Sequence, residues 1–444
     1  MRRFSICAAI LAMAAVAVAG CGCAGEERTP GSAPRGTGAG ASTGAWTTYG
    51  GSTTRAGVAP GAPDAPALRR RFSRAVDGEV YAQPLIAGGR IYVATENNSV
   101  YAFTTRGKLV WKRHLGAPVP GDDLPCGNID PSGITGTPVI AGRRLFTVAF
   151  LRSGHRHVLF GLRLGSGRVA VRANVDPPDP MVQQQRGGLL AVRGRVYVPY
   201  GGLFGDCGAY RGYVISTTQS GGGRIAYRNP APMAGIWAPA GMSAQSGTLL
   251  VSTGNGGGGF AYQNSVIRLS TGLRRVGFWA PNDWRPLSAG DVDTGSLGPL
   301  PVSGGRVFQI GKDGVGYLLS HSLGGIGAEE DAARICSGGA FGADAFRAPL
   351  AIVPCGDSLY GLRVDGDRLE VAWTSDAGGV VPVIAGDSVF AITRDGTLQQ
   401  LSFADGRRVG STHIGSGATS FPAPAAAGRT LVAPAGRRIV VFSI

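Results

Sequence analysis

The residues that could do chemistry are few, and the sequence spreads them widely. Five histidines are dispersed along the chain: His114, His155, His157, His321 and His413. No CxxC motif or Cys/His cluster occurs, which argues against a structural zinc site and against covalently attached haem. The glycine-rich run at 254–259 is not followed by Lys-Ser/Thr or by a helical pattern, so it does not indicate a phosphate-binding loop.

Charge and composition argue against a nucleic-acid-binding protein and a helical bundle. The net charge of +15 comes from 43 basic and 28 acidic residues, but the arginines are scattered and Arg69–Arg71 is the longest basic run. A nucleic-acid site needs a stripe or patch of positive charge, so we expect no nucleic-acid partner. The 74 glycines and 28 prolines also exclude a helical bundle, because a glycine inside a helix costs about 1 kcal/mol.

The N-terminal residues have the pattern of a secretory signal. Arg2 and Arg3 precede an apolar run from Ile6 to Val18, which is too short to span a bilayer stably. The run ends in Val18-Ala19-Gly20-Cys21, which resembles the bacterial lipobox. We therefore predict a lipoprotein signal peptide over 1–20 and a lipid on Cys21, holding the protein at the outer face of the bacterial membrane. The alternative is an ordinary signal cut nearby, with Cys21 left as a thiol.

Residues 21–45 are rich in Gly, Ala, Ser and Pro and predict a flexible tether, with the folded part at 46–444. An exported chain meets an oxidising compartment, so its remaining cysteines are expected to pair. We predict Cys126–Cys207 and Cys336–Cys355, with Cys23 left over, although spacing alone does not prove this pairing.

The body of the chain repeats one pattern of short strands separated by glycine turns. Equivalent second strands are expected to begin near Ile91, Leu145, Val196, Leu249, Val307, Leu350, Val389 and Leu431. Eight units at a spacing of about 40–50 residues predict an all-β, eight-bladed β-propeller of four-stranded antiparallel blades. Seven blades are the alternative if the weakest unit, the sixth around Leu350 to Val353, is a loop.

The two ends of the chain support eight blades. The last unit offers only three strands: Phe421 to Ala425, Thr430 to Ala433, and Ile439 to Ile444. A fourth strand is available at Leu68 to Val76, before the first blade. Pairing it with the last blade would close the ring and remove an open sheet edge.

One copy of the repeat resembles the tryptophan-docking repeat of pyrroloquinoline quinone (PQQ) propellers, in which an outer-strand Trp packs over a turn of the neighbouring blade. Its residues are Ala102-Phe103, Gly107-Lys108 and Trp111, and comparable outer-strand positions hold Trp279, Trp373, Tyr227 and Val171. The opening segment Trp46-Thr47-Thr48-Tyr49-Gly50-Gly51 is also similar to the entry of that superfamily. This superfamily includes quinoprotein alcohol dehydrogenases and non-catalytic propeller lipoproteins of outer-membrane assembly, so the resemblance implies fold more than activity.

The resemblance implies a set of site residues if the chain is a dehydrogenase. Trp237 precedes Asn255 of Thr253-Gly254-Asn255 at the family's spacing, so Trp237 would stack on PQQ and Asn255 would hold Ca²⁺. Asp293, or else Asp291, would be the catalytic base, and Lys312 would face the quinone. Each residue also has an ordinary structural reading: a core tryptophan, a turn asparagine, loop aspartates and a surface lysine.

Two departures from the family weigh against the redox site. The acidic metal ligand that precedes Arg-Gly-Tyr in the family is replaced by Cys207, with Asp206 one step away, so Asp206 would have to hold Ca²⁺ together with Asn255. A thiol or disulfide sulfur is a poor ligand for hard Ca²⁺. Where the family's alcohol dehydrogenases carry two adjacent cysteines, this chain has only Cys126, so a Cys126–Cys207 disulfide could have replaced that site.

The sequence therefore predicts, first, a non-catalytic binding or scaffold protein of the cell envelope. We expect a monomer without a cofactor, whose partner is an envelope protein or polymer. The alternative is a PQQ- and Ca²⁺-dependent dehydrogenase of alcohols or sugars. A third reading is a carbohydrate-binding module that uses the central channel of the propeller.

Overall fold

The computed structural model describes residues 44–415 and 420–444. The predicted leader (1–20), the lipidation site Cys21, the leftover Cys23 and the tether up to residue 43 lie outside the described residues. Within the described ranges, no helix has the length and hydropathy that a bilayer-spanning helix needs.

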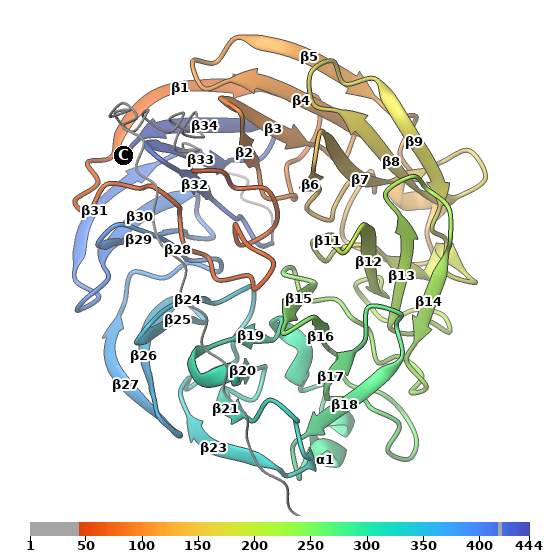
Figure 1. The fold of residues 1–444 in the computed structure, drawn as a ribbon, viewed down its shortest axis with the longest axis vertical. Coiled ribbons are helices and arrows are strands. Elements are labelled where there is room, and N and C mark those ends of the chain that lie inside the picture. The colour runs from red at the N-terminus through yellow and green to blue at the C-terminus, as the bar shows by residue number, and fades with distance from the viewer. Residues whose placement is uncertain (1–43, 416–419) are drawn as a thin grey trace, which may run out of the picture. The chain divides into compact units, whose positions relative to one another are not determined.

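Eight antiparallel sheets are arranged radially around a central axis (Figure 1). The first and innermost strands of the blades are β2 (Leu85–Ala87), β6 (Val139–Ala141), β11 (Leu190–Val192), β15 (Met242–Gln245), β19 (Leu300–Pro301), β24 (Ala345–Arg347), β28 (Val383–Ala385) and β32 (Ala425–Ala427). The second strands are β3 (Arg90–Ala94), β7 (Arg144–Leu151), β12 (Arg195–Gly202), β16 (Thr248–Ser252), β20 (Val307–Ile310), β25 (Leu350–Cys355), β29 (Ser388–Ile392) and β33 (Thr430–Pro434). Every second strand starts within one residue of its predicted position.

The third strands are β4 (Ser99–Thr104), β8 (Arg156–Arg163), β13 (Tyr213–Thr218), β17 (Val266–Leu269), β21 (Val315–Leu319), β26 (Ser358–Asp365), β30 (Thr397–Ser402) and β34 (Arg438–Ser443). The outer strands are β5 (Leu109–His114), β9 (Val169–Asn174), β14 (Ile225–Arg228), β18 (Arg275–Ala280), β23 (Glu329–Arg334), β27 (Arg368–Ser375), β31 (Arg408–His413) and β1 (Arg69–Ala75). Additional short elements are β10 (Gln183–Gln184), β22 (Gly325–Ile326), the helix α1 (Trp284–Ala289) and the 3-10 turns η1 (Gly121–Asp123), η2 (Pro180–Val182), η3 (Thr294–Ser296) and η4 (Ser303–Gly305). The sixth unit, β24–β27, is a complete blade, so the seven-blade alternative is wrong.

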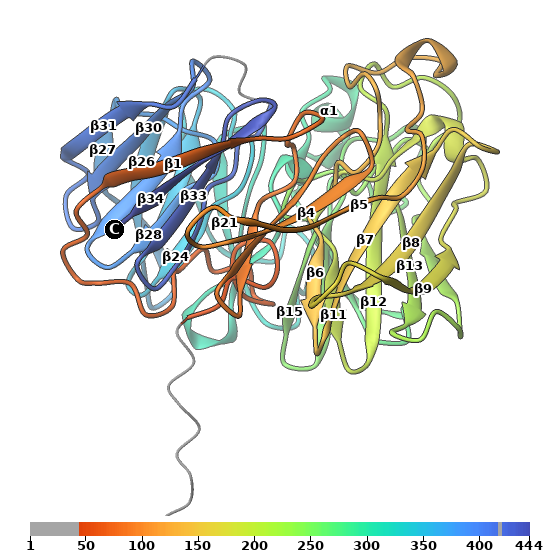
Figure 2. The same cartoon turned by 90° about the horizontal axis from the view of Figure 1, so that it is seen from above.

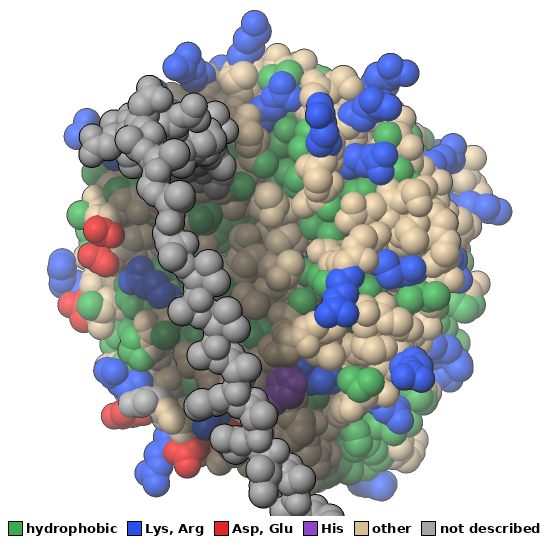
Figure 3. Space-filling view, viewed as in Figure 1, with side chains coloured by type: hydrophobic (Ala, Val, Ile, Leu, Met, Phe, Trp, Pro, Cys, Tyr) green, Lys and Arg blue, Asp and Glu red, His purple; other side chains and the backbone are tan. Residues whose placement is uncertain are grey.

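Local sequence explains the blades. The inner strands carry Val, Ile and Leu on both faces because other blades cover both, whereas outer strands alternate between buried and exposed residues. Turn glycines supply the positive φ angles that tight hairpins need: Gly88 and Gly89, at +57° and +69°, join β2 to β3. In the view of Figure 3, Lys and Arg side chains are dispersed over the face rather than gathered in a patch.

The ring is closed as predicted. Strand β1 pairs antiparallel with β34, placing Arg70 opposite Phe442 and Ser73 opposite Val440. One boundary was wrong: the first strand of the eighth blade is β32 (Ala425–Ala427), not Phe421 to Ala425. Pro422 and Pro424 explain the difference, because a proline has no backbone N–H to donate to a sheet ladder.

The predicted docking of outer-strand tryptophans is present. The Trp111 Nε1 atom donates to the Leu164 carbonyl at 2.9 Å, and its ring lies over Gly167, in the β8–β9 turn of the next blade. Trp373 repeats this arrangement over Gly406. Trp279 differs, since its Nε1 atom donates to the Glu329 carboxylate of the fifth blade at 2.9 Å.

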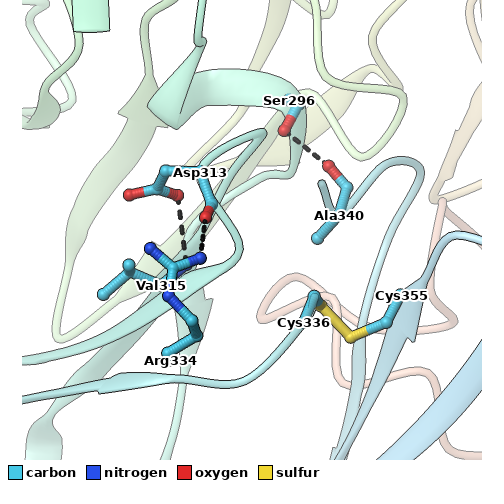
Figure 4. Close-up of a disulfide and its surroundings, with 7 residues drawn as sticks. All are labelled: Ser296, Asp313, Val315, Arg334, Cys336, Ala340 and Cys355. Carbon is cyan, nitrogen blue, oxygen red and sulfur yellow. Dashed lines mark hydrogen bonds between the residues drawn. A yellow bond between two sulfur atoms is a disulfide. The ribbon is translucent and has the colours of Figure 1, made fainter. Parts of the chain in front are cut away.

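Both predicted disulfides are also present, and Cys336–Cys355 joins the fifth blade to the sixth (Figure 4). Cys336 follows β23 and Cys355 ends β25. Beside it, the Ser296 hydroxyl donates to the Ala340 carbonyl at 2.7 Å. The disulfide therefore reinforces a junction that is already hydrogen-bonded.

The docking of Trp111 gives a stability prediction. A Cβ at Gly167 would lie 2.5 Å from the indole ring, whereas a Cβ at Gly194 would meet nothing within 4 Å, although both glycines have positive φ. Gly194→Ala should therefore lower the free energy of unfolding by about 1–2 kcal/mol, because alanine is strained at a positive φ. Gly167→Ala should lower it by a further ~1–3 kcal/mol, because its Cβ would overpack against the indole ring. Urea denaturation of the two variants measures the difference. Equal losses would contradict the docking contact.

Candidate functional site

The blade topology places all predicted site residues at one end of the ring. The turns between second and third strands, and the segments that link one blade to the next, lie at the same end because the strands are antiparallel. Helix α1, which belongs to the link between β18 and β19, marks this end in Figure 2. Asp206, Asn255 and Lys312 lie in such turns, and Trp237 and Asp293 lie in such links.

These residues line one cavity of about 400 Å³. The cavity holds every residue predicted for the dehydrogenase alternative, including Asp291. Its wall consists of Asn128, Arg186, Gly202, Leu203, Phe204, Gly205, Asp206, Tyr210, Met233, Trp237, Asn255, Asp291, Asp293, Lys312, Phe341, Ser420 and Phe421. Segments of the chain more than 100 residues apart in sequence, such as Asp206 and Lys312, thus share one site.

Asp293 is the buried carboxylate of this cavity, only 4% exposed. Its Oδ1 accepts the backbone N–H of Asn255 at 2.6 Å, and its Oδ2 lies 2.6 Å from the Lys312 Nζ atom. Burial raises the pKa of Asp293 above its usual value, and the nearby Lys312 opposes that rise. Both oxygens of the carboxylate are therefore already engaged.

The Thr-Gly-Asn turn fits around this carboxylate. A Cβ at Gly254 would lie 2.4 Å from the Asp293 Oδ1 atom and 3.1 Å from the Trp237 Nε1 atom. Only glycine lets the turn approach both groups, and this approach aims the Asn255 N–H at the carboxylate. The close packing of Gly254 against Asp293 and Trp237 therefore explains the glycine of the Thr-Gly-Asn motif without a bound ligand.

Lys312 connects the two aspartates of the cavity wall, Asp291 and Asp293. Besides Asp293, its Nζ atom contacts the Asp291 carboxylate at 3.2 Å and donates to the Asp291 carbonyl at 3.0 Å. It also lies 6.0 Å from the centre of the Trp237 ring. Burial lowers the pKa of Lys312, but the two aspartates outweigh this effect, so the pKa is raised and the ammonium stays charged.

Asp206 lies on the opposite lip of the cavity. It is exposed and has a positive φ of 54°, and its Oδ1 accepts the Tyr210 hydroxyl at 2.5 Å. Burial and the neighbouring Asp206 raise the pKa of Tyr210, so the phenol remains a neutral donor. Next to Asp206, Cys207 forms the disulfide with Cys126, as predicted, and the bond ties this loop to the link between the first and second blades.

Sequence reasoning proposed six of the seventeen lining residues, and the eleven it missed include four in links between blades: Asn128, Arg186, Phe341 and Phe421. The Arg186 guanidinium lies 5.6 Å from the centre of the Phe421 ring, and burial lowers the pKa of Arg186. All four precede the first strand of a blade. Links between blades face the central funnel, so the predicted strand positions could have indicated that these four residues line the site.

The donor set does not fit a hard cation. Ca²⁺ takes six to eight oxygen ligands, but Asp293 is paired with Lys312, Asp206 is bound to Tyr210, and Cys207 is in a disulfide. Across residues 44–415 and 420–444, no group of three or more His, Cys, Asp or Glu side chains is placed to hold a metal ion. The cavity volume and the Trp237 ring leave room for a flat organic molecule, but the metal part of a quinoprotein centre finds no ligand set here.

The Lys312–Asp293 pair gives a second prediction. Lys312→Met leaves the Asp293 charge buried with one hydrogen bond, which should cost about 3–5 kcal/mol at pH 8. The loss should shrink as the pH falls toward 4, because the carboxyl with a raised pKa then takes up a proton in the folded state. The double variant Asp293→Asn/Lys312→Met should recover most of the stability. Chemical denaturation at several pH values tests this, and a loss independent of pH would contradict it.

The known proteins that resemble this chain have the same β-propeller fold. Residues 62–198 match the family model described as outer membrane protein assembly factor BamB. No curated protein matches the sequence. Among solved structures, a quinohemoprotein alcohol dehydrogenase from Pseudomonas putida HK5 has a TM-score of 0.70 and 14% identity, covering 90% of this chain and 80% of that chain.

Two further structures span almost the whole of their own chains. A europium-containing methanol dehydrogenase has a TM-score of 0.70 and 14% identity, covering 90% of this chain and 98% of that one. BamB from Moraxella catarrhalis has a TM-score of 0.59 and 14% identity, covering 85% and 98%. At these identities the likeness shows the fold alone. The chain is therefore an eight-bladed β-propeller, similar in fold both to quinoprotein alcohol dehydrogenases and to BamB, with the BamB family model matching residues 62–198.

Proposed function

We propose that this protein is exported, anchored through a lipid on Cys21 to the outer face of the bacterial membrane, and binds an envelope protein or polymer without catalysing a reaction. The observation that carries the proposal is the state of Asp293. A general base needs a carboxylate oxygen within reach of the substrate proton. Here Asn255 and Lys312 occupy both oxygens at 2.6 Å.

The lip of the cavity supports a binding role. Phe204, in the loop between β12 and β13, is 65% exposed and lines the cavity. The Cys126–Cys207 disulfide restrains the same loop, so presenting an aromatic side chain there costs little further ordering. Exposed aromatic side chains on a restrained loop are typical anchors of protein interfaces.

The second candidate is the PQQ- and Ca²⁺-dependent dehydrogenase of alcohols or sugars. One observation favours it: Trp237, Asn255, Asp293 and Lys312 converge on a single cavity from the fourth and fifth blades and the two links that precede them. This arrangement would give a planar cofactor an aromatic wall and a cation. The metal ligands and a free base are the parts that the cavity does not supply.

A cofactor titration separates the two functions. The purified protein is mixed with micromolar PQQ and Ca²⁺, and quinone absorbance and dye reduction with ethanol or glucose are followed. We expect no saturable binding and no turnover. PQQ binding that is lost in Trp237→Ala and Asn255→Ala, but kept in the matched outer-strand variant Asn174→Ala, would support the dehydrogenase and contradict the non-catalytic binding role.

The binding role has its own test in intact cells. A photo-reactive phenylalanine analogue at position 204 should form a discrete cross-linked adduct with an envelope component. The same analogue at Val409, which is 51% exposed on the outer strand β31, serves as the control and should give none. Identical adducts from both positions, or none from 204, would contradict binding through this lip.

A further inference from the structure

The two ends of the ring differ in charge. The end that holds the candidate site is formed by the links between blades and by the turns between second and third strands. The link between β5 and β6 carries Asp122, Asp123 and Asp130 and no Lys or Arg. The link between β1 and β2 carries Asp77 and Glu79 and again no Lys or Arg. Acidic side chains therefore gather at this end, although the whole chain has a net charge of +15.

The opposite end is formed by the turns between first and second strands and between third and outer strands. In the first four blades these turns contain no Asp or Glu. We define the basic face by six residues of these turns: Arg106, Lys108, Arg143, Arg168, Arg193 and Arg274. Figure 3 looks onto this end of the ring and shows Lys and Arg side chains spread widely over it, with Asp and Glu confined to the left and lower left.

The cations of the basic face are available to a partner. Arg143, Arg168 and Arg193 are exposed, and their guanidinium groups make no hydrogen bond or ion pair within the described residues. The neighbouring Arg144 shows the structural use of an arginine here, because its guanidinium donates to the Gln219 carbonyl of the next blade at 3.1 Å. The packing of the blades therefore explains Arg144 but not the three arginines at the turns.

Exposed apolar side chains lie beside these cations. Leu109 directly follows Lys108 and begins β5, and Val169 directly follows Arg168 and begins β9. Both side chains are about half exposed, as is Val276 near the start of β18. Cationic side chains next to apolar ones suit the boundary between lipid headgroups and acyl chains. The rim of the basic face thus has the composition of a membrane-contacting surface.

The chain also enters the ring at this end. A Cβ at Gly61 would lie 3.7 Å from the Gly44 N atom and 4.0 Å from the Cα of Gly428, in the β32–β33 turn. If Cys21 carries a lipid, residues 22–43 can span at most about 70–80 Å. Such a tether holds the ring near the membrane but leaves it free to turn, so surface charge decides which end faces the lipid.

We propose that the basic face rests on an anionic phospholipid surface, so that the acidic end and the candidate cavity face away from the membrane. The inference rests on the proposed function for its setting, because the lipid on Cys21 brings the ring to the membrane. Cations spread over a flat end match a plane of phosphate headgroups, whereas a nucleic-acid site needs a stripe or patch. Each Lys or Arg near such a surface strengthens binding about fivefold.

Vesicle co-sedimentation tests the proposal with the chain from Ala24 onwards, which keeps every strand of the closed ring and lacks Cys21. Vesicles of phosphatidylcholine alone are compared with vesicles that also contain phosphatidylglycerol. We expect saturable binding to the anionic vesicles only. Binding should weaken about tenfold or more when NaCl rises from about 0.1 M to about 1 M, because the screening length falls from about 10 Å to about 3 Å.

The triple variant Arg143→Gln/Arg168→Gln/Arg193→Gln removes half of the basic face. It should bind anionic vesicles about a hundredfold more weakly, since three charges are lost at about fivefold each. Its thermal unfolding should stay unchanged, because these guanidinium groups make no bond within the described residues. A loss of binding without a loss of stability separates contact with lipid from a folding defect.

The matched control is Arg152→Gln/Arg285→Gln/Arg394→Gln. It removes the same total charge from three exposed arginines at the opposite end, two in turns between second and third strands and one in helix α1. This variant should bind anionic vesicles as well as the parent chain does.

The proposal is overturned by an absence of saturable binding to the anionic vesicles, by equal binding to the neutral vesicles, or by equal losses in the two triple variants. A single-stranded RNA that binds as tightly as the anionic vesicles and is weakened equally by the basic-face variant would assign the face to nucleic acid instead. Because the tested chain has no lipid, these results do not depend on whether Cys21 is modified. They are also independent of the cross-link from position 204.

Discussion

The pairing of β1 with β34 is the constraint on which the rest of the structure depends. A blade is a small sheet that cannot bury both of its faces alone, and a row of eight blades would expose two apolar faces at its ends. Joining Arg69–Ala75 to the strand at Arg438–Ser443 brings the first and eighth blades together. The core containing Ile91, Val100, Val440 and Phe442 is therefore continuous across the seam.

Closure of the ring also determines which loops can form a binding site together. Once the ring is shut, the turns after the second strands and the links after the outer strands meet around one end of the axis. Loops there are free to vary because β-strands below them carry the packing. This is how Asp206 and Lys312, from the third and fifth blades, come to share a cavity.

The sequence predicts the repeated parts well and the unique parts less well. Strand starts such as Val307 and Leu350 were predicted because glycine turns and β-branched runs recur in every unit. The convergence of Trp237 and Asn255 followed from the family resemblance. The boundary at Phe421 was wrong because two prolines were read as part of a strand. Arg186 belongs to no recognisable motif, and only its place in a link between two blades indicates that it lines the site.

The candidate site is built around a buried ion pair. The Lys312 ammonium neutralises the Asp293 carboxylate, and the Asn255 N–H donates to the other carboxylate oxygen. Removing either partner of such a pair leaves an uncompensated buried charge, whereas replacing both partners together costs far less.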